Sequence, residues 1–222
     1  ELSNGATSRL KVRSLVGIIP LFAVEIIHKD LFEQLKEFKI RAAEIVRTRP
    51  DLASLISNIE EANKDGNYLF SIMRAYRLEK LLKRLLDEDE FLSDYGIRSL
   101  SKYHKEHPFV FQHNGHYSIH YEPGESRSNM FGGNSNWRGP IWMPLNYMII
   151  QSLRKYYTFY GPTYQYEFPT GSGKKLNLNE IANELTKRLV RLFEPNSEGK
   201  FQYHAEDRNK LFSKDEHFKN HH

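Results

Sequence analysis

The amino-acid sequence predicts a mainly α-helical fold with one small β-hairpin inserted between helices. The first observation is that apolar residues recur at every third or fourth position in several segments, which is typical of amphipathic helices. The second is the pair Asn114 and Gly115, which favours a tight hairpin turn between short arms at residues 109–112 and 117–121. The composition, with 39% hydrophobic and 27% charged residues, is that of a globular protein.

Residues 12–27 are the most apolar run of the chain. Residues 13–28 are predicted to form a buried helix, because apolar side chains occur on more than one side. Pro20 is expected to bend this helix, since proline has no N–H to donate. Glu25 is interpreted as a paired core carboxylate in preference to a catalytic group. Charged residues interrupt the run and it is too short to cross a bilayer, so no membrane segment is predicted.

Three more helices are predicted in the first 90 residues. A capping box at Asp30 begins a helix that is expected to end before Pro50. Residues 51–62 are a short helix candidate, whereas residues 68–86 are predicted as one longer helix with a leucine-rich face. The acidic residues 87–90 are interpreted as the solvated end of that helix.

Histidines concentrate in one part of the chain, at His104, His107, His113, His116 and His120. A metal site there is the lesser alternative, because metal ligands need a fixed spacing and a supporting shell. We expect rim or surface histidines, and no metal or other cofactor. The chain has no cysteine, which excludes disulfides and thiolate metal sites and suits a reducing compartment. A cytoplasmic location is therefore expected.

The net charge of +4 comes from basic residues that are interleaved with acidic ones. Such a distribution indicates a solvated surface, because nucleic-acid binding calls for clustered Lys and Arg. A basic helical domain that binds nucleic acid is accordingly the least favoured class of function.

Residues 121–151 contain the segment that folding alone explains least. Glycine, asparagine and serine fill a loop without a regular apolar pattern, and these residues allow another molecule to approach the backbone closely. Trp137, Arg138 and Trp142 follow within six positions. Pro140 suits the first turn of a helix, and apolar residues recur at helical spacing from Trp142 onward.

This combination of side chains suits a saccharide ligand. An indole ring matches the apolar C–H face of a sugar, while asparagine amides and the arginine fork match its hydroxyls. Trp142 and Asn146 are four positions apart and are expected to share one face of the helix. The alternative, that both tryptophans are core aromatics and Arg138 pairs with a carboxylate, stays equally open.

After this helix the sequence predicts packing elements. The tyrosines of residues 156–166 are expected mainly to pack rather than to ring a sugar site. Residues 170–175, TGSGKK, lack the residues of a phosphate-binding loop, so a polar turn is preferred. Asn177 and Glu180 are predicted to cap a helix that Pro195 ends.

Residues 132–142, GGNSNWRGPIW, with the Asn-Tyr pair four positions later, resemble the signature of the glycoside hydrolase family 63 catalytic domain. Three further stretches resemble the same family in the expected order: residues 13–25 (RSLVGIIPLFAVE), 94–107 (DYGIRSLSKYHKEH) and 168–173 (FPTGSG). Chance similarity does not account for four stretches that occur in the same order as in the family. Within the family, the nearest likeness is to a large fungal branch. The resemblance places this chain in the C-terminal part of the catalytic domain.

The resemblance implies an (α/α)6 barrel. Residues 1–222 would be part of a single barrel domain that is incomplete at both ends, because only about half of the helices of such a barrel are predicted here. The implied partners are a carbohydrate substrate and the remaining segments of the parent barrel, with no nucleic acid and no membrane.

The resemblance also implies inverting hydrolysis of an α-linked glucose or mannose unit. In that reaction one carboxylic acid protonates the leaving oxygen and a second carboxylate activates water. Both groups would lie outside this chain, so its catalytic residues are unknown. Glu122 and Glu125 are the nearest local carboxylates, and the family assigns them no role. A non-catalytic helical domain that binds carbohydrate or scaffolds a partner is the alternative.

Carried over residue by residue, the resemblance gives a sugar-facing wall of Asn136, Trp137, Arg138 and Trp142, with Asn134 and Asn146 as further candidates. Arg98 and Ser99, in the turn after Gly96, are expected to approach the substrate at the barrel mouth. The alternative for Arg98 is an ion pair that tethers the turn.

Overall fold

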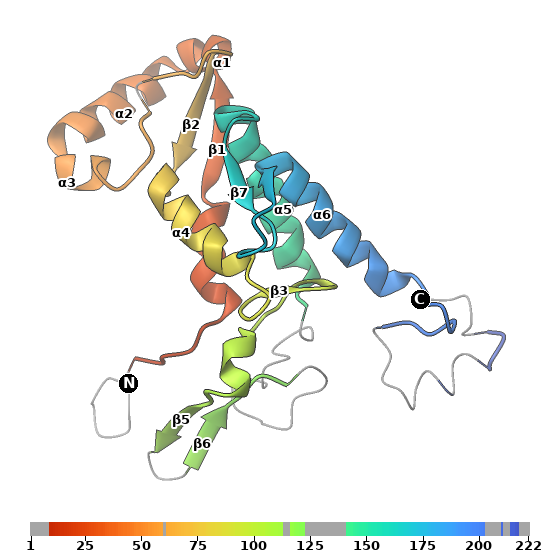
Figure 1. Ribbon diagram of the computed structural model, residues 1–222. Coiled ribbons are helices and arrows are strands. Elements are labelled where there is room, and N and C mark those ends of the chain that lie inside the picture. The colour runs from red at the N-terminus through yellow and green to blue at the C-terminus, as the bar shows by residue number, and fades with distance from the viewer. Residues whose placement is uncertain are drawn as a thin grey trace.

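The computed structural model describes residues 9–59, 61–112, 116–122, 141–202, 210 and 214–217. Its body is built around three helices, α4 (Ala75–Leu85), α5 (Met143–Tyr160) and α6 (Leu178–Val190), of which α5 and α6 run side by side (Figure 1). Helices predominate over short strands, which confirms the mainly α-helical prediction. The barrel arrangement stays a prediction.

One hydrophobic core joins these three helices. Its buried members include Leu78, Leu82, Leu85, Ile149, Leu153, Ile181 and Leu185. Burying each such side chain contributes about 1.5–3 kcal/mol, so this cluster is the main source of stability. Within the described ranges, no helix is both long and apolar enough to cross a membrane.

Residues 13–28 differ from the predicted single helix. They form a 3-10 helix, η1 (Leu15–Phe22), followed by a strand, β1 (Val24–His28). Every third side chain of a 3-10 helix shares one face. The buried face consists of Leu15, Ile18 and Leu21. The β-branched residues of β1 favour extended backbone once a partner strand is present.

That partner strand also divides the predicted helix at residues 68–86. β2 (Asn67–Ser71) pairs antiparallel with β1, with Ser71 opposite Val24, and α4 starts only at Ala75. A strand partner far away in the sequence therefore overrides the local helical pattern.

Glu25 lies on β1 and is paired, but it is not in the core. Its carboxylate accepts a hydrogen bond from Lys155 Nζ at 2.7 Å, and its side chain is 59% exposed. The hydrogen bond from Lys155 lowers the pKa of Glu25 from its ordinary value. Such an exposed pair contributes at most about 1 kcal/mol. The predicted pairing is confirmed and the predicted burial is wrong.

The helices α1 (Lys29–Gln34), α2 (Lys36–Thr48) and α3 (Pro50–Ala53) form an arm beyond the β1–β2 ribbon (Figure 1). The cap of α1 is His28, whose Nδ1 accepts from the Asp30 N–H at 3.4 Å, so the predicted capping box at Asp30 is wrong. α3 is one turn, much shorter than the predicted helix at residues 51–62.

The middle of the chain contains two small hairpins. β3 (Leu92–Ser93) pairs with β4 (Gly96–Ile97) around the predicted turn, and the 3-10 helix η2 (Lys102–Lys105) follows. β5 (Phe109–Gln112) pairs antiparallel with β6 (His116–Ile119), which confirms the predicted hairpin.

The C-terminal part follows the sequence closely. β7 (Gln165–Glu167) and β8 (Lys175–Asn177) are antiparallel and are joined through a turn that contains most of the TGSGKK stretch. The Asn177 side chain accepts from the Glu180 N–H at 3.0 Å and the Glu180 carboxylate accepts from the Asn177 N–H at 2.8 Å, which confirms the capping box. After α6 the 3-10 helix η4 (Arg191–Phe193) precedes Pro195.

The tyrosines at the end of α5 pack against one another, as predicted. Tyr156 is fully buried and its hydroxyl lies 2.6 Å from Ser71 Oγ. The Tyr160 ring lies 4.6 Å from the Tyr164 ring, centroid to centroid. Burial raises the pKa of Tyr166 to about 12, and it also raises the pKa of Tyr160.

This burial predicts alkaline destabilisation. An unfolded tyrosine loses its proton near pH 10, whereas folded Tyr166 keeps it to about pH 12. The stabilising effect is therefore complete below pH 10 and is lost as the pH rises to 12. Denaturant unfolding as a function of pH should show this fall, and Tyr166→Phe should make it shallower. Phenolate absorbance can be titrated in the unmodified chain and in Tyr166→Phe. If the substitution removes a group that ionises near pH 10, the raised pKa assigned to Tyr166 is wrong.

Candidate functional site

The predicted sugar-binding residues Asn134, Asn136, Trp137 and Arg138 lie outside the described residues. The chain on both sides of them is described. Tyr121 and Glu122 precede the segment 123–140, and Ile141 and Trp142 follow it. The geometry of the candidate site is therefore given by these flanks and by the residues that hold them. We call residues 123–140 the motif segment.

On the following side, Trp142 occupies the N-cap of α5 and its ring is partly buried against the hydrophobic core. Its carbonyl accepts hydrogen bonds from the backbone N–H of Asn146 at 2.9 Å and from the Asn146 side chain at 3.0 Å. Packing of the indole against the core agrees with the alternative in which this tryptophan is structural, so its stacking on a sugar stays a prediction.

Asn146 differs from the predicted sugar contact, because it is only 1% exposed. Its Oδ1 accepts from the Ile97 N–H at 2.7 Å, and its Nδ2 donates to the Ile97 carbonyl at 3.0 Å. The amide thus pairs with the end of β4 as a neighbouring strand would. Sequence spacing could not show this, since the partner is 49 residues away. The structure gives Asn146 a role in attaching α5 to β4.

Replacing Asn146 by leucine should reduce the free energy of unfolding by about 2–4 kcal/mol, because the Ile97 N–H and carbonyl would be left buried without partners. Denaturant unfolding measures this loss. Asn183→Leu, on the exposed side of α6, is the matched control and should stay within about 0.5 kcal/mol of the unmodified chain. Equal effects of the two substitutions would show that the Asn146 bonds contribute nothing specific.

Arg98 lies between the two flanks of the motif segment. Its Nε donates to the Tyr121 hydroxyl at 3.2 Å, and its Nη1 donates to the carbonyls of Glu88, at 3.1 Å, and of Leu92. The backbone of Arg98 forms an isolated antiparallel bridge with Ile141. Arg98 therefore tethers its turn, as the alternative foresaw, but through carbonyl oxygens rather than an ion pair.

A largely shielded carboxylate was missed by sequence reasoning. Glu90 belongs to the acidic run interpreted as solvated, yet its side chain is only 12% exposed. It forms an ion pair with Arg13, accepts from Ser101 Oγ, and lies 3.7 Å from Arg84 Nη1. No local pattern distinguishes Glu90 from its neighbours, because its cationic partner Arg13 is 77 residues away.

His104 is also buried, at 2% exposure, so its predicted place at the surface or rim is wrong. Its Nε2 accepts from the Arg13 backbone N–H at 2.8 Å, and Nδ1 lies 2.9 Å from the His107 carbonyl. Since Nε2 is an acceptor, the ring hydrogen is on Nδ1, which donates to that carbonyl. Both ring nitrogens are used structurally, and no group of three potential metal ligands occurs in the part of the chain that the structure describes.

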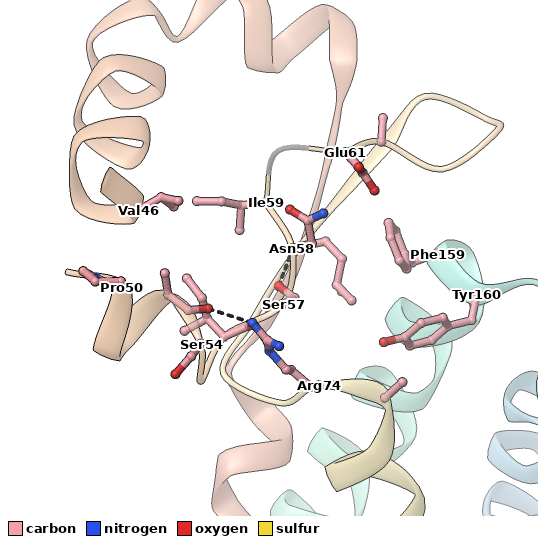
Figure 2. Close-up of a pocket in the computed structure, with 15 residues that line it drawn as sticks. Val46, Pro50, Ser54, Ser57, Asn58, Ile59, Glu61, Arg74, Phe159 and Tyr160 are labelled. Atoms are coloured by element: carbon pink, nitrogen blue, oxygen red, sulfur yellow. Dashed lines mark hydrogen bonds between the residues drawn. The ribbon is translucent and has the colours of Figure 1, made fainter. Parts of the chain in front are cut away.

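A cavity of about 800 Å³ lies elsewhere, between the α2–α3 arm, the loop after α3 and the C-terminal end of α5 (Figure 2). Arg74 enters its wall, where Nε donates to the Ile56 carbonyl at 2.8 Å and Nη2 to the Ala53 carbonyl at 2.9 Å. Phe159 and Tyr160 line the side that faces Val46 and Pro50. Because α5 has 18 residues, this cavity is about 27 Å along the helix from Trp142 at its N-cap. Of the predicted sugar-binding residues that the structure describes, Arg98, Trp142 and Asn146, none lines this cavity.

Comparison with known proteins gives a family and several relatives. Residues 69–196 match the sequence profile described as the glycosyl hydrolase family 63 C-terminal domain. An uncharacterized protein of Saccharomyces cerevisiae is 46% identical over 215 residues, which make up 95% of this chain and 20% of that protein.

Two named glucosidases are also similar. The mannosyl-oligosaccharide glucosidase of Saccharomyces cerevisiae is 32% identical over 82 residues, 36% of this chain and 7% of the enzyme. Alpha-glucosidase 2 of Arabidopsis thaliana is 28% identical over 117 residues, 53% of this chain and 12% of the enzyme. The chain thus spans about a fifth or less of the length of the curated relatives it matches. No solved structure matches it.

Proposed function

The chain belongs to glycosyl hydrolase family 63, and from this premise we propose that it is part of a glycosidase that hydrolyses an α-linked glucose or mannose unit with inversion. The observation that carries the proposal is the family match over residues 69–196, which includes the motif segment and α5. The names of the two similar glucosidases support the glucose alternative for the substrate. The acid and the base of this reaction are proposed to lie outside the chain.

Within this enzyme the chain supplies part of the sugar-binding wall. Trp137 and Trp142 provide flat apolar faces for the sugar ring. Arg138 provides a planar fork of N–H donors for two hydroxyls or for a carboxylate that must be oriented, and Asn134 and Asn136 provide amides for the remaining hydroxyls. These roles are proposals that follow from the resemblance and from the chemistry of the residues.

Exposed apolar side chains support a further part of the proposal, that other segments of the parent protein pack against this chain. η1 contains no charged residue, so its side chains would be expected to avoid solvent. Val16 is nevertheless 55% exposed and Ile19 is 45% exposed. Tyr147 and Met148, in the N-terminal half of α5, are also exposed. Apolar side chains grouped on one element in this way usually meet another part of the protein.

The test uses the full-length protein and a panel of α-glucosides and α-mannosides, with reducing-sugar detection. We expect release of glucose or mannose, and NMR should show that the first product has the opposite anomeric configuration from the substrate. Binding of the same glycosides without any hydrolysis would favour the non-catalytic carbohydrate-binding domain. Retention of configuration would reject the inverting mechanism while leaving the glycosidase in place.

A further inference from the structure

We propose that Arg98 is a positioning residue: it fixes Tyr121 and Ile141, on the two sides of the motif segment, relative to each other. The expected effect of Arg98 on catalysis rests on the proposed function, whereas its contacts with Tyr121 and Ile141 do not depend on that function. Arg98 was expected to approach the substrate directly, and the contacts of its side chain lead to a different role.

Tyr121, on the leading side, is held at both its side chain and its backbone. Its hydroxyl accepts from Arg98 Nε at 3.2 Å, and the guanidinium carbon lies 5.7 Å from the centre of the phenol ring, within the range of a cation–π contact. Its backbone N–H donates to the His104 carbonyl at 3.2 Å. Arg98 and His104 together therefore set where the chain enters the motif segment.

Ile141, on the following side, is held by the backbone of the same arginine. Arg98 and Ile141 form an antiparallel bridge, and the preceding residue, Ile97, is bonded through both its N–H and its carbonyl to Asn146 in α5. Both sides of the motif segment thus converge on residues 97–98. A single residue contacts the two flanks, one through its side chain and the other through its backbone.

Arg98 can act as a fixed point because its Nη1 and its backbone N–H are also anchored. Nη1 donates to the carbonyls of Glu88 and Leu92, and the backbone N–H donates to the Phe91 carbonyl at 2.8 Å. A planar guanidinium can hold these acceptors and Tyr121 simultaneously, whereas the single ammonium of lysine cannot. The substitution Arg98→Lys therefore keeps the charge and removes the geometry.

The first test measures hydrogen exchange in the full-length protein and does not depend on activity. Arg98→Lys should speed amide exchange in peptides covering residues 116–122 and 141–146 by about 10-fold. Arg74→Lys is the matched control, because Arg74 also donates to two carbonyls but lies at the other end of α5. It should leave these peptides unchanged. Unchanged exchange in Arg98→Lys would overturn the proposal.

The second test measures glycoside hydrolysis. If the wild-type protein cleaves no glycoside, the proposed function is rejected, and the hydrogen-exchange result alone decides the role of Arg98. We expect Arg98→Lys to lower kcat about 10-fold or more, and Arg74→Lys to change it less than about twofold. Tyr121→Phe should lower kcat in the same direction, and the double variant should be no worse than Arg98→Lys alone. Additive losses, or a change confined to KM, would mean that Arg98 binds substrate itself. Because Tyr121→Phe removes only the hydroxyl oxygen that Arg98 contacts, this variant still tests the proposal if Arg98→Lys fails to fold.

Discussion

Arg138→Ala in the full-length protein is expected to lower kcat/KM for glycoside hydrolysis by about 100-fold while leaving the thermal unfolding temperature almost unchanged. The guanidinium is proposed to hold either two sugar hydroxyls or a catalytic carboxylate. Each charge-assisted hydrogen bond of this kind is worth about 1.5–3 kcal/mol, and misplacing a reacting group adds to the loss. Activity on the best glycoside of the panel, measured beside a thermal shift assay, separates the two effects.

Arg127→Ala is the matched control for this prediction, since Arg127 belongs to the same segment and carries the same charge. It should retain most of the activity. Equal activity of Arg138→Ala and the unmodified protein would remove Arg138 from the site, and equal losses in both variants would point to a general effect of charge. Arg138→Lys should recover little, because an ammonium does not reproduce a two-pronged contact.

Elements whose signals are local could be predicted from the sequence. The capping box of Asn177 and Glu180 is complete within four residues, and the apolar residues of α6 follow at helical spacing. The β5–β6 hairpin is specified in the same way, by a turn pair between two short arms. In each case the residues that determine the structure are neighbours in the chain, so no distant partner is needed to recognise it.

The errors share a different physical cause, which is a partner distant in sequence. The predicted helices at residues 13–28 and 68–86 each contain a strand, because β1 and β2 satisfy each other's backbone hydrogen bonds. His104 is buried and Glu90 is mostly shielded from solvent, and both bond to Arg13, which is far away in the sequence. A run of acidic residues or a histidine-rich stretch carries no sign of such a partner.

The candidate site shows the same division. Its family could be inferred from the sequence, because the motif and three other stretches occur in order, and the family match over residues 69–196 confirms it. The individual roles could not be inferred in the same way. Asn146 lies in the first turns of α5, whereas Trp142 is the N-cap before the helix, so the two do not share a helix face as predicted. Asn146 pairs with Ile97, and Arg98 bonds carbonyls and Tyr121. Both residues hold the flanks of the motif segment in place.

Gly96→Ala is expected to cause the largest loss of stability of any substitution proposed for this chain, about 3–5 kcal/mol. Gly96 has a φ of +118°, which side chains rarely adopt, and this strain alone costs about 1–3 kcal/mol. An added Cβ would also lie 2.7 Å from Leu189 Cδ2 and 3.0 Å from Asn146 Oδ1. Leu189 is buried, so relieving the contact adds about 1–3 kcal/mol of overpacking.

Gly161→Ala separates the two contributions. Gly161 also has a positive φ, of +73°, but a Cβ there would meet no atom within 4 Å, so only the backbone strain remains. Denaturant unfolding should therefore place Gly161→Ala about 1–3 kcal/mol below the unmodified chain and Gly96→Ala clearly lower. In a double-mutant cycle, Gly96→Ala should cost less in a Leu189→Ala background than in the unmodified chain, because the shortened side chain makes room for the new methyl group. Equal losses at the two glycines would mean that Leu189 and Asn146 do not press on Gly96, and that β4 is free to shift against α5 and α6.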